Sequence, residues 1–382
     1  MVKISRFEAT RASQQYINQF ITKAYSNYSK KEIINEQRNN PLSFLNILKN
    51  NEKNESFKHV QLNLENFKKK SIIIKEKKSN IYIYEQIKNN ISYCGIICGV
   101  SLKEYEEKKI KIHEKTLKKR ELVFAKYLSE AKLYAEPVLI TYKGHDLSNL
   151  IQESQIDQNL IYSFTDKFKT KHIIWKTNKI KSEALIKQFS RINNLYIADG
   201  HHRMSSSFIN NANNNKCLAY IVPHSQLTTL PFHRVVEHNL NPKNLIKKIN
   251  QHNEIKIADS PLINTEKVHM YLNENWYIIN FKKTISNQDV VKNLIISKLS
   301  NNILKPIFNI QDERNNKDIK FIQGDGNISS LTKNITKNQV LFYLPIIKIK
   351  TIMKVADNNK TLPPKSTFII PKIPSGLIMM EL

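Results

Sequence analysis

The chain has 382 residues, of which 40% are hydrophobic and 24% are charged, a composition typical of a folded protein and unlike that of a disordered one. Lysine and arginine number 60 against 33 acidic residues, which gives a formal net charge of +27. A nucleic-acid partner would explain this excess. Lysine runs such as Lys68–Lys70 and Lys118–Lys119 occur in every region, however, so we favour a compositional bias spread over all solvated faces.

The three cysteines, Cys94, Cys98 and Cys217, have no metal-ligand spacing and are too few for a disulfide framework. They favour a reducing compartment. The longest apolar runs, such as Val340–Ile347, have the length of a strand and are far too short to span a membrane. The first residues lack the apolar core of a secretory signal. We therefore expect a cytoplasmic protein with no membrane partner.

The first 88 residues predict short helices and strands joined by polar connections. Asn40–Ile47 has the pattern of a turn that enters a strand, and Ile81–Tyr84 is a β-prone run. Gly95–Leu102 predicts a buried strand because it is almost entirely apolar.

A helix is predicted after Thr116, where apolar residues recur at helical spacing. Pro137 is expected to end this helix, and Val138–Tyr142 predicts the next strand. Further strands are expected at Ile173–Trp175, Leu195–Ala198, Leu218–Val222, Leu230–Val236, Val268–Leu272 and Trp276–Phe281.

The segment Asp199–Arg203 joins a predicted strand to a helix that starts near Met204. A helix entered in this way leaves its first backbone N–H groups unpaired and directed at whatever lies above the sheet. Gly200 allows the backbone to approach a ligand closely and to adopt a positive φ angle. The sequence therefore predicts a phosphate-binding turn.

The side chains of this turn fit the same hypothesis. His201, His202 and Arg203 supply donors that match phosphate oxygens, and Asp199 could orient a histidine or hold a divalent cation. A purely structural turn and a metal site remain as alternatives, although adjacent histidines rarely direct both rings at one ion. The chain contains no Walker-type loop, G-x-G-x-x-G, G-x-S-x-G or H-E-x-x-H motif, so a nucleotide site would differ from a P-loop or a Rossmann turn.

Glu114 follows His113 shortly before the helix predicted after Thr116. A carboxylate at this place could act as a general base toward a substrate hydroxyl. The lysines on both sides, Lys111 and Lys115 among them, make a solvated charged face the simpler interpretation.

Three residues of the C-terminal half are weaker candidates. His233 and Arg234 could add a second phosphate contact, or they could be a satisfied core histidine beside a surface arginine. Lys365 could cap the site, whereas the preceding Pro363-Pro364 favours ordinary turn chemistry.

The string Tyr196–Arg203 resembles the signature of a broad bacterial and archaeal family known as a domain of unknown function. That family is related to the ADP-dependent free-serine kinases and, more distantly, to the ParB and sulfiredoxin nucleotide-binding fold. The resemblance covers almost the whole chain. The other matching positions are Asn40-Pro41, Ser43–Leu45, Tyr82–Tyr84, Gln86, His113-Glu114, Thr116, His233-Arg234, Pro363–Thr367, Pro371-Lys372 and Gly376-Leu377.

The resemblance implies a mixed α/β (α+β) protein with a ParB/sulfiredoxin-like nucleotide-binding core at residues 89–240. Residues 1–88 would pack on this core, and residues 241–382 would return a final strand towards it. In the serine kinases a glutamate before the first core helix is the catalytic base, which implies that role for Glu114. The kinase DGHHR residues hold the nucleotide phosphates. The corresponding residues here are Asp199, Gly200, His201, His202 and Arg203, with His113, Thr116, His233, Arg234 and Lys365 as additional candidates.

The implied activity is phosphoryl transfer from ADP or ATP to a small hydroxyl metabolite, with free L-serine as acceptor and Mg²⁺ bridging the phosphates. A non-catalytic nucleotide-sensing or nucleic-acid-binding module of the ParB type is the alternative, although no helix-turn-helix with a recognition stripe supports nucleic acid. One position departs from the family. The Pro-Tyr-Asp segment expected near residue 25 is replaced by Ala24-Tyr25-Ser26, which implies altered specificity or reduced activity.

Overall fold

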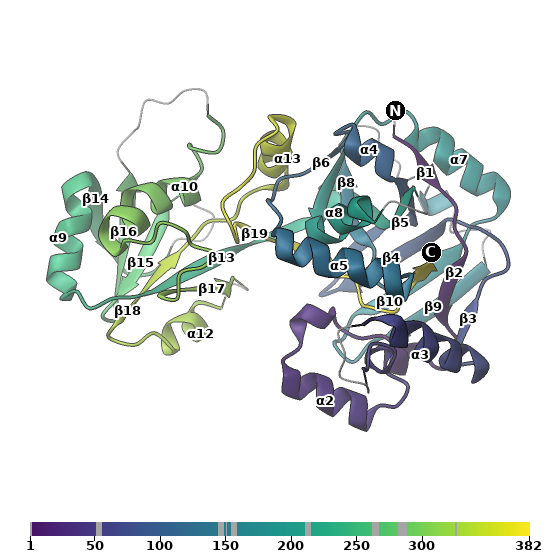
Figure 1. Ribbon diagram of the computed structural model, residues 1–382. Helices are drawn as coiled ribbons and strands as arrows, with labels where there is room; N and C mark the ends of the chain where they lie inside the picture. Colours follow the sequence, from purple (N-terminus) through teal and green to yellow (C-terminus); the bar gives the residue numbers. More distant parts are fainter. Residues whose placement is uncertain are drawn as a thin grey trace. The chain divides into compact units, whose positions relative to one another are not determined.

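The computed structural model describes residues 2–50, 56–143, 149, 151–153, 159–210, 215–261, 267–281, 289–324 and 327–382. The chain forms two compact units (Figure 1). The first unit comprises residues 1–112, 116–227 and 371–382, and the second comprises residues 113–115 and 228–370. Both units combine helices with β-sheets, so the protein has the mixed α/β architecture that the sequence predicts.

The main sheet of the first unit contains nine described strands. Its order is β6 (Ile110–Lys111), β11 (Leu195–Asp199), β8 (Val138–Tyr142), β12 (Lys216–Pro223), β5 (Ile91–Ser101), β4 (Tyr82–Lys88), β10 (Lys171–Lys176) and β9 (Asn159–Thr165), with β1 (Ile4–Ser5) beside β5. The pairs β11–β6 and β12–β8 are parallel, and the other pairs are antiparallel. All residues of β8 are buried, as expected for a central strand that is covered on both faces.

A smaller sheet of the first unit joins the two ends of the chain. Its order is β3 (Ile73–Lys75), β2 (Ala9–Ala12), β20 (Met379–Glu381) and β7 (Leu133–Tyr134). The helices of this unit are α1 (Ile17–Phe20), η1 (Tyr25–Asn27), α2 (Lys30–Asn39), η2 (Phe44–Asn46), α3 (Lys58–Lys69), α4 (Leu102–Glu106), α5 (Lys118–Ala131), α7 (Lys179–Phe189), α8 (His201–Ile209) and η3 (His224–Gln226). α5 packs against α8, where the Ser206 hydroxyl donates to the Glu121 carbonyl at 2.9 Å.

The second unit is built on one antiparallel sheet. Its order is β14 (Asn253–Ala258), β16 (Asn275–Phe281), β15 (Val268–Leu272), β18 (Gln339–Tyr343), β13 (Thr228–Glu237) and β17 (Ile319–Gln323), with β19 (Thr367–Ile370) beside β13. Its helices are α9 (Pro242–His252), α10 (Ile295–Leu299), the π-helical η4 (Ser300–Leu304), α11 (Lys305–Phe308), α12 (Ile328–Lys333) and α13 (Ile349–Asp357). A cluster of Val235, Trp276, Leu331, Leu341 and Tyr343 forms part of its core.

The helix predicted after Thr116 is confirmed as α5, which ends at Ala131 before Pro137. The strands predicted at Val138–Tyr142 and Val268–Leu272 are confirmed with the same bounds, as β8 and β15. None of the helices in the described part of the chain has the length and apolar character needed to cross a lipid bilayer.

The prediction of a strand within Asn40–Ile47 is wrong, because the segment forms the short 3₁₀ helix η2. The Ser43 hydroxyl accepts a hydrogen bond from the Leu45 amide at 3.4 Å and so starts a helical turn. The Asn46 side chain then donates to the Asn40 carbonyl at 2.8 Å, which closes the turn on itself. The apolar residues that suggested a strand are buried without any strand partner.

Candidate functional site

The turn that the sequence identifies lies in the first unit, between β11 and α8. β11 ends at Asp199, α8 begins at His201, and Gly200 between them has φ 97° and ψ 29°, in the left-handed region. Another residue would be strained there, and its Cβ would meet Nε and Nη2 of Arg203 at 3.0 Å. Gly200 also has no side chain with which to cap α8. A helix start of this kind is a favourable place for an anion, since its first backbone N–H groups point away from the helix.

Four charged side chains of the first unit surround this turn, and we call them the turn cluster: Asp199, Arg203, Glu136 and Lys372. The Lys372 ammonium lies 2.8 Å from Oδ2 of Asp199, and Nη2 of Arg203 lies 3.9 Å from the same oxygen. Nη1 of Arg203 lies 3.5 Å from the Glu136 carboxylate and donates to the Pro137 carbonyl at 2.5 Å. The Arg203 side chain is 23% exposed, so it is neither enclosed in the apolar core nor fully solvated.

The carboxyl of Asp199 has an unusually low pKa. Partial burial would raise this pKa, but the charges of Lys372 and Arg203 outweigh that effect and lower it to about 2. Oδ1 of Asp199 also accepts a hydrogen bond from the Gly200 amide at 2.9 Å. Asp199 is therefore an anion that holds two cations and the turn backbone in place.

Beside the turn, α8 is tied to the start of α5 through His202 and Glu121. The Leu117 amide donates to Nε2 of His202 at 3.0 Å, so this nitrogen carries no proton and a neutral ring is protonated on Nδ1. The buried Glu121 carboxylate accepts hydrogen bonds from the hydroxyls of Thr116 and Ser205. Burial would raise the pKa of Glu121, but these hydroxyls lower it, so an ionised carboxylate is stabilised here.

The segment His113–Lys115 belongs to the second unit, whereas the turn belongs to the first. Glu114 is exposed, and His113 is buried, with its carbonyl accepting a hydrogen bond from the Leu362 amide at 2.8 Å. Glu114 and the turn residues are therefore carried by different units.

His233 and Lys365, two further candidates from the sequence, are also in the second unit. His233 is fully buried, its Nδ1 accepts a hydrogen bond from the Leu344 amide at 3.0 Å, and its ring stacks on Tyr343 with centroids 4.1 Å apart. Lys365 is exposed and has a left-handed backbone, with φ 50°, and its ammonium lies 5.3 Å from the centroid of Phe232.

Arg234 is enclosed by the second unit, with no exposed surface. Its Nε and Nη2 donate to Oε2 of Glu313, both at 3.3 Å. Nη1 donates to the carbonyls of Phe232 and Lys365, and Nη2 donates also to the carbonyl of Pro364. Since a guanidinium has five N–H donors, a phosphate could bind Arg234 only if one of these bonds broke. Arg234 holds the Pro364-Lys365 turn instead.

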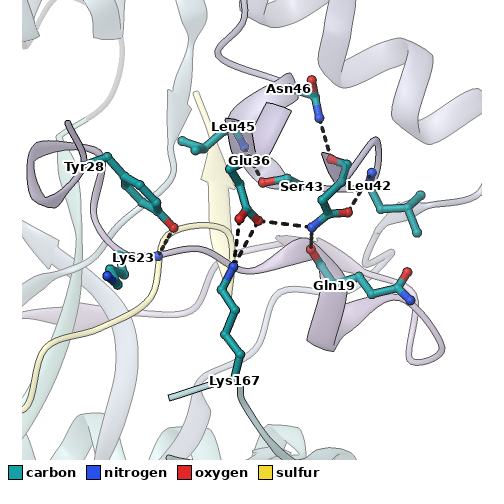
Figure 2. Close-up of polar contacts among 10 residues, drawn as sticks. Gln19, Lys23, Tyr28, Glu36, Leu42, Ser43, Leu45, Asn46 and Lys167 are labelled. Carbon is teal, nitrogen blue, oxygen red and sulfur yellow. Dashed lines mark hydrogen bonds and ion pairs between the residues drawn. The ribbon is translucent and has the colours of Figure 1, made fainter. Parts of the chain in front are cut away.

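A second polar site of the first unit includes Lys23 and Tyr28, which flank in sequence the positions 24–26 where the family pattern is interrupted. A hollow of about 290 Å³ is lined by Lys23, the exposed face of α2 and the turn between β9 and β10. Figure 2 shows the Glu36 carboxylate of α2 paired with the Lys167 ammonium of that turn, at 2.9 and 3.1 Å. This ion pair joins α2 to the turn between β9 and β10.

The sequence did not identify two members of the turn cluster, Glu136 and Lys372. Glu136 follows the predicted helix and precedes Pro137, so it had only the pattern of a helix end. Lys372 is 173 residues from Asp199, and no local pattern relates residues so far apart. The one available signal was the match of Pro371-Lys372 to the family pattern, which assigned no role to the lysine.

The family model described as protein of unknown function (DUF1015) matches residues 4–302, and the chain belongs to this family. No curated protein matches the chain. Among solved structures, SbnI with a C-terminal truncation from Staphylococcus aureus has 12% identity and a TM-score of 0.42, with 72% of this chain and 82% of that chain covered. A mutant free serine kinase in complex with ADP has 11% identity and a TM-score of 0.40, with 75% and 91% covered.

A conserved hypothetical protein from Pyrococcus furiosus has 11% identity and a TM-score of 0.37, with 78% of this chain and 97% of that chain covered. Likeness at these values assigns no role to any residue of this chain. The functional argument therefore depends on the chemistry of the turn itself.

Removing the Arg234 side chain is expected to destabilise the second unit strongly. Arg234→Met leaves the buried Glu313 carboxylate without its cation, a change that typically costs about 3–5 kcal/mol. Urea unfolding followed by circular dichroism measures the loss. Lys365→Met is the control, because it removes an exposed side chain and keeps the carbonyl that Arg234 binds. Equal stability of the two variants would contradict the structural role of Arg234.

The low pKa of Asp199 predicts a specific dependence of stability on pH. A carboxyl with a lowered pKa in the folded state stabilises the fold above its ordinary pKa near 3.9, and this contribution is lost as the pH falls towards about 2. Between pH 5 and pH 2.5 the melting temperature of the wild type should therefore fall further than that of Asp199→Asn. Asp318→Asn, at an exposed aspartate of the second unit, should behave as the wild type does. An equal fall of the melting temperature with pH in all three proteins would refute the prediction.

Proposed function

We propose that this protein is a phosphotransferase that moves a phosphoryl group from ADP or ATP to a small hydroxyl metabolite, with free L-serine as the first candidate acceptor. The observation that carries the proposal is the turn at Gly200, where α8 begins without a side-chain cap and the cations Arg203 and Lys372 lie alongside. Phosphates bind at such helix starts because backbone N–H groups and the helix dipole both favour negative charge.

The turn supplies what phosphoryl transfer mainly requires, which is positioning and neutralisation of charge. In the proposed complex the nucleotide phosphates lie at the start of α8, and Arg203 stabilises the charge that develops on the transferred group. His202 accepts from the Leu117 amide through Nε2, so Nδ1 is the nitrogen that could donate to a phosphate oxygen. Asp199 contributes by holding Arg203 and the Gly200 backbone in this arrangement.

We assign the role of general base to Glu114, which would take the proton of the acceptor hydroxyl. Two facts support this assignment: the resemblance to the serine kinases at His113-Glu114, and the exposure of the carboxylate.

Mg²⁺ would add charge neutralisation between the nucleotide phosphates. Within the turn cluster, Asp199 is the carboxylate that lies near both cations, and its two oxygens already accept hydrogen bonds from Gly200 and Lys372. We therefore place the ion on nucleotide phosphates and water, which are its usual ligands, and not in a cage of protein groups.

The direct test is incubation of the full chain with ADP or ATP and a pool of hydroxyl metabolites, followed by mass spectrometry. The proposal expects one metabolite to gain a phosphoryl group in the presence of the protein and Mg²⁺. Nucleotide binding with no phosphorylated product would instead favour a non-catalytic, ParB-type nucleotide sensor. The net charge of +27 is compatible with a nucleic-acid-binding form of that alternative, which predicts a DNA affinity that falls steeply with salt.

Replacing Glu114 by glutamine is expected to lower turnover by about 10²–10⁴-fold, the usual contribution of a general base. The affinity for nucleotide should stay the same, because the amide keeps the shape of the side chain and the residue does not bind phosphate. Glu106→Gln, at an exposed glutamate of α4, is the matched control and should keep full turnover. Wild-type turnover by Glu114→Gln would exclude Glu114 as the base.

A further inference from the structure

The last segment of the chain, residues 371–382, is a fixed part of the first unit. Its strand β20 pairs with β2 and β7. The Ser375 amide and carbonyl both bond to the backbone of Thr22, at 2.9 and 3.2 Å, and the Gly376 amide donates to the Ala135 carbonyl at 3.0 Å. Lys372 is three residues before Ser375. The backbone that carries it is therefore held by contacts with Thr22, Ala135, β2 and β7, and not by β11 or α8.

This anchored segment places the Lys372 ammonium at the turn. Nζ lies 2.8 Å from Oδ2 of Asp199, whose other oxygen accepts from the Gly200 amide at 2.9 Å. The side chains of Lys372 and Asp199 are 35% and 40% exposed. The ion pair is therefore reachable by a ligand from solvent, and a partly exposed pair of this kind is individually weak.

The charge balance of the turn cluster depends on Lys372. Arg203 carries one positive charge, while Asp199 and Glu136 carry two negative charges, so these three side chains alone would repel a phosphate. Lys372 brings the cluster to neutrality and places a second cation beside the helix start. Since an ammonium has three N–H donors, it can bind a carboxylate and a phosphate oxygen at the same time.

We infer that Lys372 is a phosphate-binding residue of this site, which contacts the diphosphate of a bound nucleoside diphosphate while Asp199 holds its ammonium in place. This inference rests on the proposed function, because it concerns the same turn. It assigns the C-terminal segment a role in ligand binding as well as in folding. The recognised chemistry is the diphosphate group, which free pyrophosphate shares with ADP.

Calorimetric titration of the full chain with ADP, pyrophosphate and adenosine tests the inference. Lys372→Met should weaken binding of ADP and of pyrophosphate about 10- to 100-fold, the range expected for a hydrogen bond between charged groups. It should leave the affinity for adenosine unchanged. Lys372→Arg, which keeps the charge, should retain most of the affinity, and Lys88→Met, at an exposed lysine where β4 ends, should behave as the wild type.

A second measurement uses the unaltered chain and so does not depend on how the variants fold. Bound ADP should slow reductive methylation of Lys372 relative to Lys88, as followed by mass spectrometry of the digested protein.

The outcomes separate the inference from the proposed function. If the wild type binds neither ADP nor ATP, the proposed function fails. If the wild type binds ADP while Lys372→Met binds it equally well, or if ADP leaves the methylation of Lys372 unchanged, the role of Lys372 is overturned and the proposed function stands. Equal losses of ADP and adenosine binding in a folded Lys372→Met variant would also overturn it, since they would indicate a purely structural residue.

Discussion

The left-handed backbone at Gly200 is the constraint on which the arrangement of the site depends. It turns the chain directly from β11 into α8, so that a single residue separates the end of the strand from the start of the helix. Because position 200 has no side chain, the guanidinium of Arg203 can pack closely against the turn, with Nε and Nη2 only 3.0 Å from where a Cβ would be. From there Arg203 reaches both Glu136 and the Pro137 carbonyl, which join the start of β8 to the same turn. Gly200 thus allows the guanidinium of Arg203 to lie beside the start of α8.

The two arginines that the sequence marked as phosphate ligands have opposite environments. Arg203 is partly exposed, and two carboxylates hold it beside a helix start. Arg234 has no exposed surface, and burial lowers its pKa to about 10 even though Glu313 favours the charged form. The first arrangement suits an arginine that meets a ligand, whereas the second suits one that fixes a turn. The sequence alone does not distinguish these two environments, since both Arg203 and Arg234 directly follow a histidine.

Much of the fold could be predicted from the sequence, since burial follows local hydrophobic patterns. β8, β15 and α5 are apolar runs or helical repeats with clear ends, and they form where they were expected. β9 lies at the end of residues 143–166, a mostly polar stretch in which no strand was predicted. In η2 the Ser43 hydroxyl accepts a hydrogen bond from the Leu45 amide and starts a helical turn, in a segment where the sequence predicted a strand.

The candidate site divides in the same way. The motif that makes the turn is contiguous, so the sequence could identify Asp199–Arg203. The remaining members of the turn cluster are brought there by tertiary structure, Lys372 through the pairing of β20 with β2 and β7 at the end of the chain. An ion pair between residues this far apart leaves no trace in local composition. The charge balance of the site therefore becomes visible only in the folded unit.

The central claim is that an anion binds at the start of α8. The most direct measurement is a two-dimensional ¹⁵N–¹H NMR titration of the full, isotope-labelled chain with ADP, with adenosine as the reference ligand. The account predicts that ADP shifts the backbone amide signals of Gly200, His201 and His202 more than any others, and that adenosine leaves them largely unmoved. Saturable binding of ADP with these three amides unchanged would contradict it, because the phosphates would then lie elsewhere.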